Sequence, residues 1–284
     1  MSVLYNILVS KEELDLDKTL DSGQAFRWRK TGDYWSGVIG DMLCVLKQHD
    51  NCIETNVPLE HRHILIDYLN LDMNYTDTIS KLDLDKYALD CYNVSKGIHI
   101  LRQDYFETMV TFLMSSCNTM VRIRNIVNEL CKTYGNKLET EFQGIKFEGY
   151  TFPTVDVLAG ISESDFTKLG MGYRAKYLVS MVNRLHNNKS ILDNLTSKIN
   201  GDETARIDSV WILNSFNGVG PKVSNCISLF AGHHLSAFPI DTHINRIINR
   251  EYKGNIDLKR FGDIAGIIQQ YMFYSEAFKS NSFK

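Results

Sequence analysis

The pattern of hydrophobic and polar residues changes near residue 95, and this change divides the chain in two. Before it, short runs rich in β-branched and aromatic residues alternate with turn residues. Three runs have the length of strands and are separated by Gly and Asp turn signals: FRWRK (26–30), YWSGVI (34–39) and MLCVLKQ (42–48). Polar helical stretches follow around residues 59–95. Residues 1–95 are therefore predicted to form a curved antiparallel sheet domain with short helices.

From about residue 96 the apolar positions follow the period of a helix. Residues 104–117 place an apolar stripe at Phe106, Val110, Leu113 and Met114, and residues 120–135 repeat the spacing. Further helices bounded by Gly, Asn, Asp or Pro are expected near 163–170, 174–187, 204–215, 221–230, 241–251 and 257–278. The predicted fold class is α+β, with an N-terminal antiparallel β-sheet domain (1–95) followed by a helical region (96–284).

Composition and charge exclude some classes of protein. The N-terminal segment has no basic stretch followed by an apolar run, and no stretch is apolar enough to span a membrane, so a cytoplasmic protein is expected, associated with the nucleoid in a bacterium or nuclear in a eukaryote. The six cysteines lack C-x-x-C spacing, which favours reduced thiols over a disulfide or zinc framework. The net charge is −3, so any binding to nucleic acid would depend on a local cluster of cations.

The stretch LNSFNGVGPKVSNC (213–226) interrupts two helical segments with a Gly-x-Gly-Pro-Lys turn. Gly218 and Gly220 permit a positive φ, so the chain can reverse tightly and present its amides. Pro221 suits the first position of the next helix. These features predict a helix–hairpin–helix motif at about 204–230, whose positive helix end suits a phosphate oxygen. From the loop alone, an ordinary corner between two helices, packed through its glycines, is an equally good interpretation.

Lys222 follows this turn, and Asp241 lies in FPIDTH. Together with five further blocks, in the same order along the chain, this stretch resembles the 8-oxoguanine DNA glycosylases of the helix–hairpin–helix superfamily. The blocks are DSGQAFRW (21–28), GIHILRQD (97–104), FLMSSCNTMVRI (112–123), LGMGYRAKY (169–177) and AGIIQQYMF (265–273). The resemblance implies two helical subdomains that flank a DNA-binding cleft. It also implies a bifunctional enzyme that excises 8-oxoguanine from duplex DNA and then nicks the strand as an AP lyase.

The resemblance assigns the chemistry to Lys222 and Asp241. Lys222 would attack C1′ of the damaged nucleotide and form a Schiff base, which requires a neutral amine. Burial and the positive end of the helix would both favour that neutral form. Asp241 would stabilise positive charge on the sugar. Without the resemblance, Lys222 would be interpreted as a surface or phosphate-binding residue and Asp241 as a helix N-cap.

Four residues are expected to bind the damaged base. The resemblance places Cys226 and Phe273 on its two faces, Gln269 at its Watson–Crick edge and the carbonyl of Gly23 at the N7 proton that guanine lacks. Helical spacing agrees, because Lys222 and Cys226, like Gln269 and Phe273, are four residues apart. The alternatives are a small core thiol, an amphipathic helix with Phe273 in the core, and a simple turn at Gly23.

The remaining candidates concern the rest of the DNA. Arg122, Tyr173 and Arg174 match family residues that fill the gap left by the extruded base and read the orphaned cytosine, and His243 matches a phosphate contact. Cys117 departs from the pattern, because close relatives of the animal type carry an Asn there. The resemblance therefore implies a weaker readout of cytosine.

Two other hypotheses fit the sequence less well. Endonuclease-III-like or adenine-specific glycosylases usually carry a four-cysteine iron–sulfur loop near the chain end, and no cysteine follows Cys226. A non-catalytic helix–hairpin–helix DNA-binding module would not need Lys222 and Asp241 together. The expected partner is double-stranded DNA containing oxidised guanine, bound by a monomer. No catalytic metal or cofactor is expected, although the family suggests a structural cation at the hairpin carbonyls.

Overall fold

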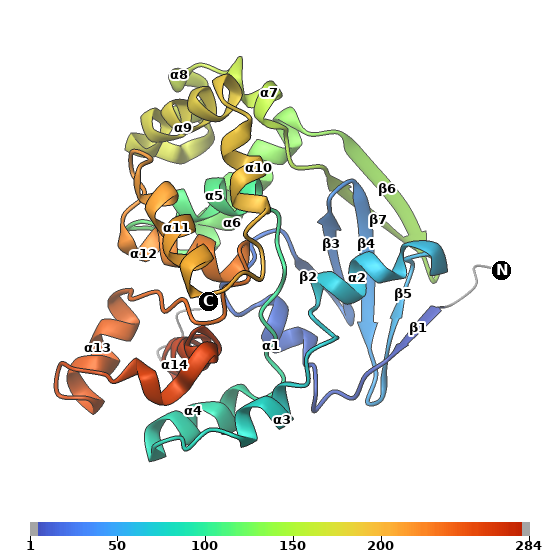
Figure 1. The fold of residues 1–284 in the computed structure, drawn as a ribbon. Helices are drawn as coiled ribbons and strands as arrows, with labels where there is room; N and C mark the ends of the chain where they lie inside the picture. Colours follow the sequence, from blue (N-terminus) through green and yellow to red (C-terminus); the bar gives the residue numbers. More distant parts are fainter. Residues whose placement is uncertain (1–4, 280–284) are drawn as a thin grey trace.

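The computed structural model describes residues 5–279, and it begins with a five-stranded antiparallel sheet in the order β1-β5-β4-β3-β2 (Figure 1). The strands at 34–39 and 42–48 match the predicted segments from end to end. The strand predicted at 26–30 instead spans residues 29–31. Trp28 lies just before the first residue of β2, and its ring packs against Gly37, where a Cβ would be 2.5 Å from Trp28 Cδ2. The strands are β1 (Tyr5–Leu8), β2 (Arg29–Thr31), β3 (Tyr34–Ile39), β4 (Met42–Gln48) and β5 (Cys52–Thr55).

Both faces of this sheet are covered. Because neighbouring residues of a strand point to opposite faces, Cys44 and Leu46 of β4 pack with α1 (Leu16–Leu20) and α2 (Arg62–Tyr68). Leu43 and Val45 pack with Phe142 and Phe147 on the other face. These two phenylalanines belong to a hairpin, β6 (Lys137–Phe142) and β7 (Ile145–Tyr150), that lies beside the sheet (Figure 1). The sequence interpretation placed only helices after residue 96 and missed this hairpin.

The rest of the described chain is mainly helical and shares one large core. The predicted helix 257–278 is interrupted at Gly262 (φ 53°), and the predicted helix 163–170 is regular only to Phe166 and ends at Gly170 (φ 91°). The elements are η1 (Leu59–His61), α3 (Tyr75–Ser80), α4 (Lys86–Ser95), α5 (Tyr105–Leu113), α6 (Met120–Tyr134), α7 (Val155–Ala159), α8 (Glu163–Phe166), η2 (Thr167–Met171), η3 (Gly172–Arg174), α9 (Ala175–Asn187), α10 (Ser190–Thr196), α11 (Glu203–Asn214), α12 (Pro221–Phe230), α13 (Thr242–Glu251), η4 (Leu258–Ile264) and α14 (Ala265–Lys279).

The sheet followed by helices confirms the predicted α+β fold class. The last helix, α14, returns to pack on α4, where the Ser95 hydroxyl donates to the Tyr271 carbonyl (3.1 Å). Residues on both sides of residue 95 therefore contribute to one core, and the division of the chain at that residue stays a prediction. None of the helices in residues 5–279 is long and apolar enough to cross a membrane.

Candidate active site

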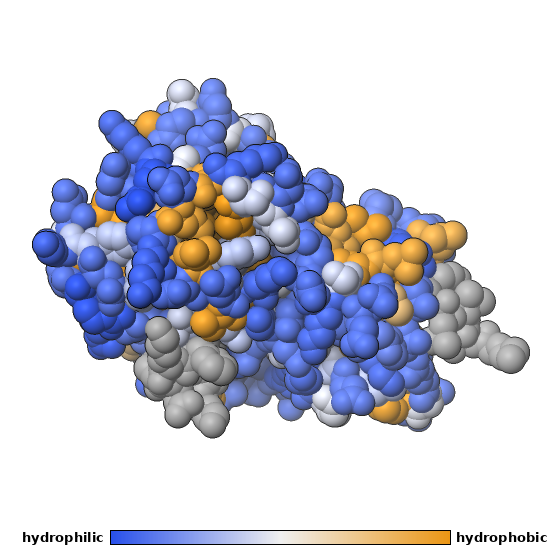
Figure 2. Space-filling view, turned by 90° about the horizontal axis from the view of Figure 1, so that it is seen from below, coloured by the Kyte–Doolittle hydropathy of each residue, from blue (hydrophilic) through white to orange (hydrophobic). Residues whose placement is uncertain are grey.

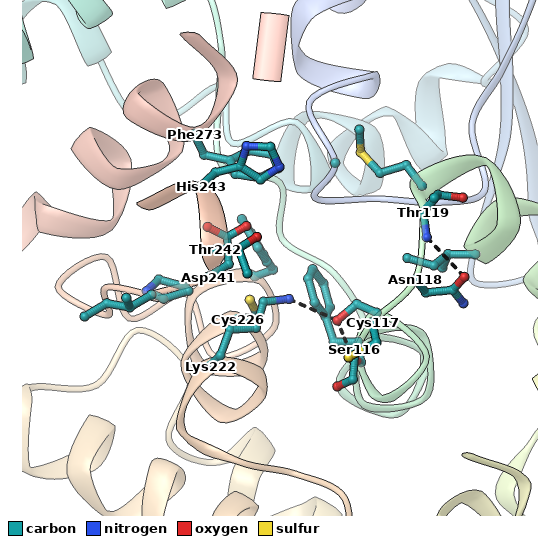
Figure 3. Close-up of a pocket in the computed structure, with 18 of the residues that line it drawn as sticks. Ser116, Cys117, Asn118, Thr119, Lys222, Cys226, Asp241, Thr242, His243 and Phe273 are labelled. Atoms are coloured by element: carbon teal, nitrogen blue, oxygen red, sulfur yellow. Dashed lines mark hydrogen bonds between the residues drawn. The ribbon is translucent and has the colours of Figure 1, made fainter. Parts of the chain in front are cut away.

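A cavity of about 840 Å³ lies where α5, α12, α13 and α14 meet the loop that follows α1 (Figure 3). It collects most of the candidate residues, although they are far apart in the sequence. Those that line it include Gly23, Cys117, Lys222, Cys226, Asp241, His243, Gln269 and Phe273. Figure 2 shows one face of the molecule, on which hydrophobic residues gather in a hollow bordered by hydrophilic ones.

The helix–hairpin–helix motif is formed by α11 and α12. Gly218 takes a φ of 84°, and a Cβ there would lie 2.7 Å from Tyr177 Cγ, so this position requires glycine. The expectation that Gly220 also uses a positive φ is wrong: its φ is −100°, because it is the extended N-cap before Pro221. No atom lies within 4 Å of a Cβ built on Gly220. No side chain of the described residues caps this end, so the first amides of α12 lack a side-chain acceptor.

Lys222 enters the cavity from the first turn of α12. It is half-buried, and its Nζ donates a hydrogen bond to Ser115 Oγ (3.0 Å) and lies 5.5 Å from the centre of the Phe112 ring. Cys226, one turn later, is buried beside it (Figure 3). Burial raises the pKa of the Cys226 thiol, and the opposing effect of Lys222 is smaller. Cys226 is therefore a neutral thiol that can present an apolar surface.

Asp241 is placed by α13, which it caps. Its carboxylate accepts a hydrogen bond from the Ile244 amide (2.8 Å), as expected of a helix N-cap. Because Asp241 also lines the cavity, capping leaves it available for chemistry. His243 packs edge-on against Phe273, with ring centres 5.6 Å apart. The buried Nδ1 of His243 has no hydrogen-bond partner among the described residues.

Gly23 and Gln269 lie on the side of the cavity formed by α14. Gly23 has a φ of 79°, and a Cβ there would be 2.9 Å from Met120 Sδ. Gln269 is 4% exposed, and its Oε1 has no hydrogen-bond partner within residues 5–279. A buried unpaired acceptor is costly unless something fills it, so Gln269 can receive a donor from a bound molecule. Its neighbour Gln270 donates to the Ser22 carbonyl (2.9 Å) and so fixes α14 against this loop.

Arg122, Tyr173 and Arg174, like the hairpin glycines Gly218 and Gly220, are not among the cavity-lining residues. Tyr173 is 53% exposed and follows Gly172, whose φ is 56°, so it projects from a tight turn. Arg174 is only 5% exposed, so it is not a solvated surface cation; its Nε donates to the Ser116 carbonyl (3.0 Å) and its Nη2 to the Cys117 carbonyl (3.0 Å). Arg122 is exposed, and its Nη2 donates to the Gly170 carbonyl (3.3 Å).

Sequence reasoning assigned no role to Ser115, Met120 or Gln270, although all three line the cavity. Ser115 and Met120 lie within the block FLMSSCNTMVRI, and Gln270 lies beside Gln269. Their sequence positions therefore carried a signal, but their partners could be identified only from the packing.

Comparisons with known proteins agree with this geometry. Residues 6–109 match the N-terminal domain of 8-oxoguanine DNA glycosylases, and residues 110–257 match the HhH-GPD superfamily of base excision DNA repair proteins. The chain is 31% identical to the N-glycosylase/DNA lyase OGG1 of Arabidopsis thaliana, over 96% of this chain and 80% of that protein. It is 30% identical to an N-glycosylase/DNA lyase of Saccharomyces cerevisiae, over 87% of this chain and 70% of the relative.

The fold is also similar to solved structures. One is the Clostridium acetobutylicum 8-oxoguanine glycosylase/lyase in complex with double-stranded DNA that contains cytosine opposite 8-oxoguanine. The two chains share a TM-score of 0.85 and 29% identity over 95% of this chain and 93% of the other. MBOgg1 in complex with a low-affinity DNA ligand gives a TM-score of 0.87 and 28% identity, over 99% of this chain and 97% of that chain. On this evidence the chain belongs to the HhH-GPD superfamily of base excision DNA repair proteins and carries the N-terminal domain of the 8-oxoguanine DNA glycosylases.

Proposed function

We propose that the protein is a bifunctional DNA glycosylase and AP lyase that removes 8-oxoguanine from duplex DNA. The observation that carries this proposal is the meeting of an amine, Lys222, and a carboxylate, Asp241, in one cavity with the unpaired acceptor of Gln269. The matching N-terminal domain supports oxidised guanine as the base. The glycosidic bond is inaccessible in stacked DNA, so the nucleotide is flipped into the cavity.

The damaged base lies between Cys226 and Phe273 and is identified by polar groups at its edges. The carbonyl of Gly23 accepts the proton on N7, which distinguishes 8-oxoguanine from guanine. Gln269 accepts a hydrogen bond at the Watson–Crick edge through Oε1. Gly23 and Phe273, which contact different parts of the base, pack directly against each other. A Cβ on Gly23 would lie 3.2 Å from Phe273 Cε1.

The reaction forms and breaks bonds at C1′ of the flipped nucleotide. The lone pair of the neutral Lys222 amine forms the N–C1′ bond, while the bond from C1′ to the base breaks and its electrons leave with the base, which takes up a proton. Asp241 stabilises the positive charge that develops on the sugar. The nitrogen lone pair then forms the C1′=N bond while the C1′–O4′ bond breaks, and O4′ takes up the remaining amine proton, which gives a Schiff base. Removal of a proton from C2′ by a base forms the C2′–C3′ double bond, and this β-elimination expels the 3′ phosphate with the electrons of the C3′–O bond.

The remaining candidates bind the duplex, and the protein acts as a monomer. The amides at the start of α12 and His243 contact the phosphates of the damaged strand, and Arg122, Tyr173 and Arg174 contact the strand opposite. The carbonyls of Asn217, Gly218 and Val219 accept no backbone hydrogen bond within the described chain, so they fit a structural cation at the hairpin. The proposed reaction needs no cofactor.

Duplexes that contain 8-oxoguanine, incubated with the protein and borohydride, test this function. Lys222→Gln is expected to bind the damaged duplex but to lose base release, strand cleavage and the trapped adduct. Lys81→Gln is a matched control, because Lys81 is exposed at the C-cap of α3, outside the cavity. Undiminished trapping in Lys222→Gln would place the nucleophile elsewhere. Binding by the wild type without any base release would favour the non-catalytic DNA-binding module.

A further inference from the structure

Ser115 stands between the C-terminal end of α5 and the nucleophile. Its hydroxyl donates to the Phe112 carbonyl (2.7 Å), so the hydroxyl hydrogen is already engaged. A hydroxyl has one hydrogen and two lone pairs. A lone pair of Ser115 Oγ therefore accepts the hydrogen bond that Lys222 Nζ donates (3.0 Å). The direction of this hydrogen bond is therefore fixed by the backbone of α5.

The turn that carries Ser115 is itself held from outside. Asn118 Nδ2 donates back to the Met114 carbonyl (3.1 Å), which closes the turn. Arg174 binds the carbonyls of both Ser116 and Cys117 from η3. Residues 114–118, here called the α5 turn, thus touch Lys222 on one side and Arg174 on the other.

We propose that Ser115 positions the amine of Lys222, and that the α5 turn couples this contact to Arg174. The inference rests on the proposed function, in which Arg174 faces the strand opposite the lesion. A lysine side chain has a flexible four-carbon stem, and a displacement of about 1 Å can cost on the order of 100-fold in rate. Ser115 limits that freedom. When Arg174 turns to the orphaned base, the carbonyls of Ser116 and Cys117 lose the hydrogen bonds that Arg174 donates. The α5 turn then shifts with Ser115, so the position of the Lys222 amine depends on which base lies opposite the lesion.

Three variants separate positioning from an ordinary local role of a serine at a helix end. Ser115→Ala removes the acceptor, Ser115→Thr keeps a hydroxyl, and Ser116→Ala is the control, because Ser116 contributes its carbonyl rather than its side chain to Arg174. With 8-oxoguanine opposite cytosine, Ser115→Ala is expected to lower the single-turnover rate of borohydride trapping by roughly tenfold. Its affinity for the duplex should stay within about twofold, and Ser115→Thr and Ser116→Ala should resemble the wild type.

A second measurement uses the DNA-free protein, so it does not depend on the proposed reaction. Reductive methylation with formaldehyde and cyanoborohydride, followed by mass spectrometry, reports how freely Lys222 reacts. Lys222 should be methylated faster in Ser115→Ala than in the wild type or Ser115→Thr. Equal methylation rates in all three proteins would overturn the positioning role. A wild type that shows the protection but traps no adduct would instead contradict the proposed function.

The coupling is tested by combining Ser115→Ala with Arg174→Ala and measuring trapping opposite cytosine and adenine. If the α5 turn transmits the state of Arg174, the double variant is less impaired than the product of the two single effects. Ser115→Ala alone should also reduce the ratio of the rates opposite cytosine and adenine. Purely multiplicative effects with an unchanged ratio would overturn the coupling.

Discussion

Gly23 lies so close to Phe273 that a Cβ at residue 23 would come within 3.2 Å of Phe273 Cε1. The two residues are at opposite ends of the chain, and their contact sets the width of the cavity on the side of α14. Gln270 reinforces the contact, because its amide donates to the carbonyl of Ser22, the residue before Gly23. The pocket for the base therefore depends on how the last helix meets the N-terminal domain.

Gly23→Ala should lower the rate of 8-oxoguanine excision, whereas its effect on the free energy of unfolding should be no larger than that of a control glycine. The added Cβ must displace Phe273 and the thioether of Met120, which lies 2.9 Å from its position. We expect the single-turnover rate of 8-oxoguanine release to fall on the order of tenfold. Gly32→Ala is the matched control, since Gly32 also has a positive φ (57°) but nothing within 4 Å of its Cβ. The left-handed backbone destabilises both variants by about 1–2 kcal/mol, and only Gly23→Ala should lose activity.

Gly220→Ala should weaken DNA binding without destabilising the protein. Gly220 has an ordinary φ of −100° and open space around its Cβ, so alanine is accommodated and the free energy of unfolding should change by less than about 1 kcal/mol. A phosphate at the start of α12 would meet the new methyl group. In a Lys222→Gln background, we expect lower affinity and a salt slope smaller by about 0.9 for each phosphate that the variant no longer binds.

Gly218→Ala is the contrasting variant in the same turn. It combines a φ of 84° with a distance of 2.7 Å from the added Cβ to Tyr177 Cγ, so it should lower the melting temperature of the free protein. If Gly220→Ala binds DNA with the affinity and salt slope of its parent, the start of α12 does not contact a phosphate.

The sequence predicted correctly those helices and strands whose first and last residues are set by neighbouring residues in the chain. The helix α12 begins and ends at the predicted residues 221 and 230, because Pro221 sets its first turn and Gly220 its N-cap. The hairpin of β6 and β7 was missed because its outward residues are charged and its few inward ones, such as Phe142 and Phe147, become recognisable only against the sheet. A weak local signal was present, because Leu138, Thr140 and Phe142 alternate with charged residues and Gln143-Gly144 forms a two-residue turn with positive φ.

The same limit applies to the site. Helical spacing correctly placed Lys222 with Cys226 and Gln269 with Phe273, but no spacing rule brings the two helices to one cavity. The resemblance supplied that step, and the large core that both α12 and α14 enter provides its physical basis. The contact of Ser115 with Lys222 was not predictable, because it depends on the C-terminal end of α5 meeting the N-terminal end of α12.

His233 should make the fold sensitive to acid. It is 6% exposed, and burial lowers its pKa to about 4; the charge of Arg102 acts in the same direction. The other nearby titratable groups are Asp72, Asp67 and His234. An unfolded histidine has a pKa of about 6.5, so the unfolded state takes up the proton first as the pH falls. The neutral His233 therefore contributes to the free energy of unfolding above pH 6.5. This contribution, about 3 kcal/mol in total, is lost as the pH falls from 6.5 to 4.

Urea unfolding at several pH values checks this prediction. His233→Asn should be less stable than the wild type at neutral pH, but its stability should fall less between about pH 6.5 and 4. Asparagine tolerates the positive φ of residue 233 (50°). His63→Asn is the control, because His63 is exposed on α2. If His233→Asn loses as much stability as the wild type over this range, His233 is not the source of the acid sensitivity.

Cys117→Asn should increase the preference for cytosine opposite the lesion. Cys117 has a φ of 50°, a conformation that asparagine adopts more readily than most residues. The change therefore keeps the α5 turn and its carbonyl contact with Arg174. It also replaces a weakly hydrogen-bonding thiol with an amide that can donate and accept. One such hydrogen bond contributes on the order of 1 kcal/mol, or roughly fivefold in the ratio of rates. The wild type should still prefer cytosine, but by a smaller margin than animal-type enzymes.

Single-turnover rates opposite all four bases decide the matter, with two further variants. Cys117→Ala removes the thiol without adding an amide, so it should not increase the preference. Arg174→Ala should reduce the preference, because the guanidinium can donate to N3 and O2 of cytosine in a geometry that adenine does not offer. Equal rates opposite every base in the wild type, or the same ratios in Cys117→Ala and Cys117→Asn, would show that residue 117 does not read the opposite strand.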